Sequence, residues 1–145
     1  MDRLKEFVVV SERLTGHSHT ELMGTGSAEQ YLQTLHRAVP EQVLDDLLAT
    51  AHDPTADDAV TAGLLADPRL GPVARNIILL WYCGTWQQLD DSWRREYDGQ
   101  EVEAHVVSAN AYLSGLQWTV ARAHAPGGNM QGFAAWSRRP EGEAS

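Results

Sequence analysis

The 145-residue sequence has few of the residues that disulfide frameworks, cysteine metal sites and nucleic-acid surfaces require. Its one cysteine, Cys83, excludes an internal disulfide and a metal site built from several cysteines. Lys and Arg number 11 against 20 Asp and Glu, and the densest basic spots are the pairs Arg94–Arg95 and Arg138–Arg139. Because DNA and RNA phosphates repel a chain of net charge -9 that has no basic patch, we expect no nucleic-acid partner.

Long apolar runs are also missing. The longest one, from Ile77 to Cys83, is too short to cross a bilayer. The opening residues, MDRLKEFVVV, mix both charges with a short apolar stretch and do not form the apolar region of a secretion signal. We therefore expect no membrane span and a cytoplasmic protein. The alternative is a periplasmic or otherwise extracytoplasmic protein, if a leader was trimmed or if the chain is exported with a partner.

Helical spacing of apolar residues dominates the N-terminal half. Phe7, Val10 and Leu14 fall at i, i+3 and i+7, which predicts a first helix that Gly16 ends. Residues 16–27 are polar and glycine-rich and predict a loop or a broken turn. Ser27, followed three residues later by glutamine, resembles a capping box and predicts that a second helix begins there.

The second half contains the most apolar segment, PVARNIILLWYCGTW, which Pro72 begins. A helix that is apolar on all sides is buried on all sides, so this segment is expected to be central or to meet a partner. Residues 87–108 predict either a short helix or a hairpin at YDGQ, and the two stay open. The chain as a whole is expected to be one all-α domain, residues 1–145, of about five or six helices. Residues 1–118 are its body and 119–145 an irregular arm.

Tryptophan is frequent, with five in the chain, and four of them are Trp81, Trp86, Trp118 and Trp136. The simpler interpretation is an aromatic-rich core. The alternative is an interface, because aromatic residues with polar groups are enriched where proteins meet. We favour the interface for the stretch APGGNMQGFAAWSRRP, which has no helical or strand periodicity. Its backbone groups need hydrogen-bond partners that a folded neighbour supplies.

Four segments, in order along nearly the whole chain, resemble the small subunits of FAD-dependent sugar dehydrogenases, such as those of sorbitol, gluconate and glucose dehydrogenases. EFVVVSERLTGH resembles the opening helix of that family, IILLWYCGTW its central segment, SANAYLSGLQW a later helix and PGGNMQGFAAWSRRP its terminal arm. The resemblance implies a non-catalytic subunit that holds no cofactor itself. Its partner is a large flavoprotein of the glucose-methanol-choline type, which binds the FAD. A cytochrome c subunit often completes such complexes.

Under this hypothesis the chain stabilises and solubilises its partner, and the binding energy concentrates in a few aromatic residues and the glycines of the arm. The expected partner-binding residues are Trp81, Tyr82, Trp86, Tyr112, Trp118, Gly127, Gly128, Met130, Gly132, Phe133 and Trp136. The glycines allow close backbone approach, so the arm could also shape the substrate entrance of the large subunit. We expect no catalytic residue and no metal ligand in this chain.

Two other functions compete with this one. His17 and His19, with Glu21 nearby, suggest a small metal-dependent or histidine-based enzyme, but no second pair with ligand spacing follows downstream. The other is a stand-alone helical protein that binds a small apolar ligand in a tryptophan-lined pocket. A shift of tryptophan fluorescence on adding such a ligand, without any partner protein, would favour this second alternative.

Overall fold

The apolar residues near the N-terminus form the first helix, as their spacing predicts. The computed structural model describes residues 2–53 and 58–117, and helix α1 spans Arg3–Thr15. The side chain of Asp2 caps its first turn, and Gly16 ends it in the left-handed conformation with φ 78°. Phe7, Val8 and Val10 are buried, so one face of α1 belongs to the core.

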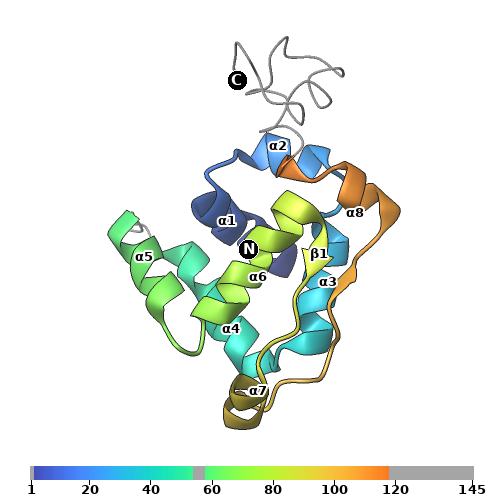
Figure 1. Ribbon diagram of the computed structural model, residues 1–145. Coiled ribbons are helices and arrows are strands. Elements are labelled where there is room, and N and C mark those ends of the chain that lie inside the picture. Colours follow the sequence, from blue (N-terminus) through green and yellow to red (C-terminus); the bar gives the residue numbers. More distant parts are fainter. Residues whose placement is uncertain (1, 54–57, 118–145) are drawn as a thin grey trace, which may run out of the picture.

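The described residues contain eight α-helices, one 3-10 turn and one pair of short strands (Figure 1). The all-α class is therefore confirmed, with more and shorter helices than expected. After α1, the elements are α2 (His19–Gly24), α3 (Ala28–Ala38), α4 (Glu41–Ala49), η1 (Thr50–His52), α5 (Asp58–Ala66), α6 (Gly71–Cys83), β1 (Thr85–Trp86), α7 (Asp91–Tyr97), β2 (His105–Val106) and α8 (Ala109–Leu113).

Helix α2 lies where the sequence predicted a loop or a broken turn. Its capping box is complete: Glu21 N–H donates to Ser18 Oγ at 3.2 Å, and Ser18 N–H donates to Glu21 Oε1 at 2.9 Å. The capping box predicted at Ser27 is wrong, because the Ser27 side chain makes no capping hydrogen bond to α3. Ser27 is buried instead, and its hydroxyl accepts a hydrogen bond from Asn110.

Helix α6 is the central element, as its apolar composition predicts. It contacts α1, α5, β1 and α8, and Figure 1 shows it running through the middle of the body. Its burial is not complete, since Ile78, Leu79 and Tyr82 are only partly covered. Gly84 ends it in the left-handed conformation with φ 68°.

Of the two structures that the sequence left open for residues 87–108, the short helix is present, as α7. Helix α7 ends at Asp98, which adopts the left-handed conformation with φ 63°. The strand pair is not a hairpin around YDGQ, because β1 precedes α7 and β2 follows it. The two strands are antiparallel, with Trp86 opposite His105, and they bring the segment before α8 alongside the end of α6.

Two of the predicted partner-binding residues belong to the core of the chain itself. The Trp81 ring stacks on Phe7, with ring centres 5.9 Å apart, and meets the edge of Tyr31 at 4.9 Å. Trp86 is fully buried, and its Nε1 donates to Val102 O at 3.1 Å. The prediction that these two indoles lie on a docking surface is therefore wrong. Trp81 stabilises the junction of α1, α3 and α6, and Trp86 joins β1 to the segment before β2, because large aromatic side chains gain most from burial.

Within residues 2–53 and 58–117, no helix combines the length and the apolar character that crossing a bilayer requires. The separation of a helical body over residues 1–118 from an arm over 119–145 stays a prediction, because residues 118–145 lie outside the described part of the chain.

Candidate functional site

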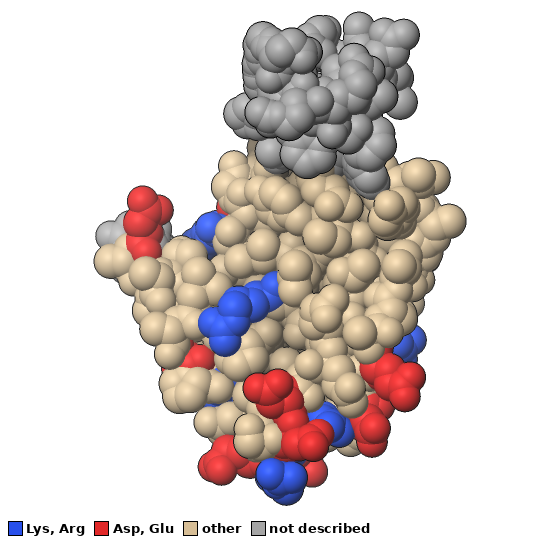
Figure 2. All heavy atoms as spheres, in the orientation of Figure 1, with Lys and Arg blue, Asp and Glu red and all other residues tan. Residues whose placement is uncertain are grey.

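Two segments without any Asp, Glu, Lys or Arg lie next to each other in the fold. They are residues 76–89, which end α6 and form β1, and residues 104–117, which form β2 and α8. The pairing of β1 with β2 and the contacts of α6 with α8 bring them together. On the side shown in Figure 2, charged side chains gather at the end that carries α7, whereas the surface around α8 is free of them. In a chain of net charge -9, this uncharged area is a distinct surface.

Large apolar side chains are exposed on this surface. Leu113 is 73% exposed and Tyr112 is 42% exposed on α8, and Met23 is 41% exposed on α2. Val106 of the adjoining strand is also exposed. We call the exposed side of α2, of α8 and of the turn that follows α8 the α2–α8 face. Its exposed side chains include a tyrosine and a methionine, which are enriched in protein interfaces, together with one carboxylate, that of Glu21.

Helix α8 is held in place by close backbone packing and by hydrogen bonds to distant residues. A Cβ atom at Gly84 would come within 2.5 Å of the Ala111 carbonyl carbon, so only glycine lets the two backbones meet. Asn110 Nδ2 donates to Thr25 O at 3.1 Å and to Ser27 Oγ at 3.0 Å. The short helix is therefore fixed to the end of α6 and to the connection between α2 and α3.

An open groove of about 410 Å³ runs along the α2–α8 face. Helix α2 and the residues after it supply one wall, and the turn after α8 supplies the other. The lining residues are Thr20, Glu21, Gly24, Thr25, Ser114 and Leu116. Leu116 is buried, whereas Glu21 presents the one carboxylate among these residues. The groove thus offers hydroxyl groups, an apolar side chain and one negative charge.

A row of polar side chains lies beside the groove. His17 Nδ1 is 3.4 Å from Glu21 Oε1, and His17 Nε2 is 3.3 Å from the Tyr82 hydroxyl. The imidazole also meets the Tyr82 ring edge-on, with ring centres 5.9 Å apart. The row orients Tyr82 and joins α2 to the end of α6. Among the described residues, no group of three or more His, Cys, Asp and Glu side chains could hold a metal ion.

The capping hydrogen bond from the Ser18 backbone, with His17 as a smaller cause, lowers the pKa of Glu21. A carboxylate whose pKa is lower in the folded chain than in the unfolded chain stabilises the folded chain. This stabilisation is fully present at pH values above the pKa of the unfolded chain. This stabilisation is lost as the pH falls through the lowered value. We therefore expect α2 to loosen under acidic conditions.

Replacing Ser18 with alanine removes the capping oxygen of α2 and is expected to cost about 1 kcal/mol of stability. Thermal unfolding of the variant measures the loss, and hydrogen exchange should rise first in α2. Ser92→Ala, at an exposed position of α7, is the control and should change stability by less than about 0.5 kcal/mol. Equal effects of the two substitutions would show that the capping box contributes nothing.

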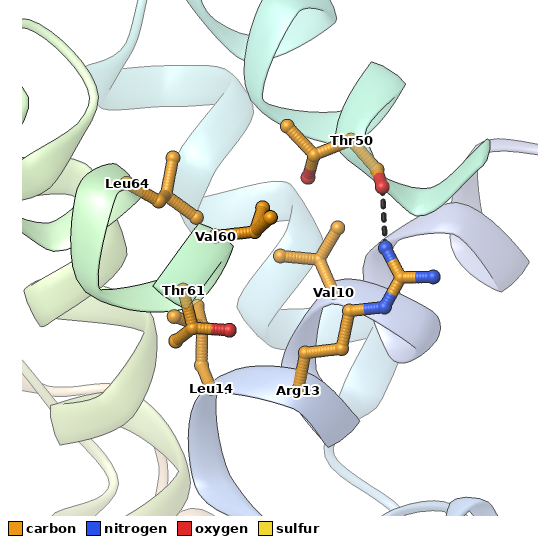
Figure 3. Close-up of a pocket in the computed structure, with 7 residues that line it drawn as sticks. All are labelled: Val10, Arg13, Leu14, Thr50, Val60, Thr61 and Leu64. Carbon is orange, nitrogen blue, oxygen red and sulfur yellow. Dashed lines mark hydrogen bonds between the residues drawn. The ribbon is translucent and has the colours of Figure 1, made fainter. Parts of the chain in front are cut away.

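A second groove lies between α1, η1 and α5 (Figure 3). It is apolar and holds about 20 Å³, room for about one water molecule. Arg13, at its edge, donates to the carbonyl oxygens of Thr50 and, at 3.0 Å, of Asp53. This guanidinium therefore caps the end of η1, and the groove is a packing seam between Val10 and Leu64 that is too narrow for a ligand.

One of the predicted partner-binding residues, Tyr112, is exposed on the α2–α8 face. A second one, Tyr82 of α6, is half-buried beside this face. The other predicted residues, apart from the two core tryptophans, lie outside the described part of the chain: Trp118, Gly127, Gly128, Met130, Gly132, Phe133 and Trp136. The sequence prediction missed Met23, Val106 and Leu113. The absence of charge over residues 104–117 is the signal that could have indicated the last two.

The α2–α8 face combines exposed apolar groups with an open groove, and the described residues that line the groove include no assembled set of nucleophile, base and acid. Comparison with known proteins adds no relative to this picture. No protein-family model, no curated protein and no solved structure matches the chain.

Proposed function

We propose that this chain is a non-catalytic small subunit that binds, stabilises and solubilises a large FAD-dependent sugar dehydrogenase, with the α2–α8 face as its docking surface. One observation carries the proposal: the stretch 104–117 has no charged side chain and exposes Tyr112 and Leu113 in a strongly acidic chain. The four segments that resemble dehydrogenase small subunits supply the identity of the partner.

Burial of exposed apolar groups supplies the driving force for this association. Each square ångström of apolar surface removed from water contributes roughly 25 cal/mol. A rigid aromatic such as Tyr112 contributes large contact area for little loss of side-chain freedom, and tyrosine is common among the residues that dominate binding energy. Since α8 is already fixed to the body through Asn110 and Gly84, it would lose little further freedom on binding.

The proposal assigns the chemistry to the partner. The large subunit, of the glucose-methanol-choline type, binds the FAD and the sugar, and a cytochrome c subunit can complete the complex. This chain supplies surface, and the arm glycines Gly127, Gly128 and Gly132 approach the substrate entrance. Under this proposal assembly takes place in the cytoplasm.

The test is co-expression of the chain with the product of the neighbouring reading frame, which the proposal predicts to be an FAD-binding protein. We expect a complex with the absorption spectrum of a flavin to co-elute with this chain. Leu113→Asp should weaken the complex at least about tenfold, equivalent to about 1.4 kcal/mol, because a charge is then buried against an apolar partner surface. Titration of the purified subunits measures the affinity.

Ala62→Asp is the matched control, because it introduces the same charge at an exposed position of α5, away from the α2–α8 face. Its affinity should equal that of the unchanged chain. A lone chain that never co-elutes with the flavoprotein would sink the proposal. If the two variants weakened the complex equally, the partner would bind elsewhere than on the α2–α8 face.

A further inference from the structure

The described part of the chain ends on the α2–α8 face. Ser114 and Leu116 line the groove, and Gln117 follows them directly. Gln117 Oε1 accepts a hydrogen bond from Cys83 Sγ at 3.7 Å, which fixes the end of this turn against α6. Residues 118–145 are therefore joined to the body at a point beside the groove, through Gln117.

This point of departure makes residues 118–145 the nearest possible occupant of the groove. Each residue of an extended chain reaches about 3.3–3.6 Å, so only a few residues are needed to cross the groove from Gln117. A segment tethered so closely has an effective concentration on the order of millimolar. Even weak binding in cis would then outcompete a free molecule at ordinary protein concentrations.

The composition of the segment complements the surface that it leaves. Residues 118–139 contain Trp118, Phe133 and Trp136, with three arginines and no acidic residue. The groove offers the buried Leu116, three hydroxyl side chains and the Glu21 carboxylate. The segment and the body also carry opposite net charges. Residues 118–145 have three arginines and two glutamates, a net charge of +1, so residues 1–117 carry a net charge of -10. The aromatic residues and arginines of the segment therefore complement the exposed apolar side chains and the carboxylate of this face.

We propose that residues 118–139 bind in cis across the α2–α8 face of the free chain and shield its exposed apolar side chains. A partner that docks on this face must first displace the segment. The contact is a property of the lone chain, so it can be tested without the flavoprotein, and its failure leaves the proposed function standing.

A spin label on the segment, in the full chain, tests the contact directly. The label is attached at Ser137→Cys in a Cys83→Ser background, and the amide signals of the ¹⁵N-labelled chain are recorded. We expect strong broadening at Thr20, Gly24 and Ser114. The amides of α7, at the opposite end of the body, are the internal control and should stay sharp (Figure 1). Uniform broadening, or none at the groove, would overturn the proposal.

A mixed sample separates binding in cis from self-association. The ¹⁵N-labelled chain without a spin label is mixed with an unlabelled chain that carries one. No broadening is expected at the groove, because the tethered segment already occupies it. Broadening in this sample as strong as within one chain would identify a second copy as the occupant and would also overturn the proposal.

A label-free measurement covers the case in which the Cys83→Ser background does not fold. A protease site inserted between Gln117 and Trp118 lets the segment be cut from the folded full chain. On cutting and dilution, the amides of Gly24 and Ser114 should shift, and adding the segment back should restore them. Unchanged amide positions after cutting would show that the segment does not bind the face.

Discussion

Replacing Trp81 with alanine is expected to lower the free energy of unfolding by about 3–5 kcal/mol, the range found for large aromatic residues in well-packed cores. The ring is fully buried between Phe7 and Tyr31, so truncation leaves a cavity where α1, α3 and α6 meet. Urea unfolding followed by circular dichroism measures the change. The loss is a large fraction of the stability of a domain of this size.

Trp81→Phe is the matched control for this prediction. Trp81 Nε1 makes no hydrogen bond with the described residues, so the indole contributes mainly through its packed area. Phenylalanine keeps much of that area and should cost clearly less than alanine. A Trp81→Ala chain of unchanged stability that fails to bind the flavoprotein would show that Trp81 is an interface residue after all.

The Gly84→Ala substitution is expected to destabilise the chain by about 2–5 kcal/mol. An L-residue in the left-handed conformation costs roughly 1–2 kcal/mol, and forcing atoms together adds about 1–3 kcal/mol. At Gly84, with φ 68°, the new Cβ atom would lie 2.5 Å from the carbonyl carbon of Ala111, which is backbone and cannot rotate away. Helix α8 must therefore shift, and the α2–α8 face is distorted with it.

Gly16→Ala separates the two contributions to this cost. Gly16 ends α1 with φ 78°, yet no other atom lies within 4 Å of a Cβ atom built there. The Gly16→Ala chain should therefore lose only the conformational part, about 1–2 kcal/mol. Thermal unfolding of both variants gives the difference. Equal losses would mean that the contact between Gly84 and Ala111 does not hold α8 in place.

The helices with long, regular apolar spacing could be predicted from the sequence. In α1, the apolar positions recur over several turns, and Gly16 supplies an unambiguous stop. Helix α6 is equally clear, because its apolar residues leave no polar face. Helix α2 was missed because it spans only six residues and buries one side chain, Leu22. A helix so short depends on its capping box and on tertiary contacts, which periodicity does not reveal.

The strand pair and the positions of the tryptophans depend on contacts between distant residues. The β1–β2 pair joins Trp86 to His105 and Thr85 to Val106, residues 19 and 21 positions apart in the chain, across an intervening helix. No local pattern in the sequence indicates such a pair. The frequency of tryptophan could not show which indoles are covered. Trp81 and Trp86 are covered by the chain itself, because α1, α3 and residue Val102 pack over them.

The candidate site was predictable only in part. Tyr112 was predicted from its place in an aromatic segment, and it is exposed on the α2–α8 face. Leu113 and Met23 were missed because an apolar residue next to a helical stripe is usually expected to be buried. The groove between α2 and the turn after α8 joins residues about ninety positions apart, such as Thr20 and Ser114, and only the fold brings them together.

Hydrogen exchange of the full chain, with and without the flavoprotein subunit, tests most directly whether the α2–α8 face is the docking surface. Binding should slow exchange in α2, in α8 and in the turn that ends at Gln117, whereas α7 should exchange at the same rate in both samples. Protection confined to α7 or α5, with α8 unchanged in a complex that does form, would contradict the account.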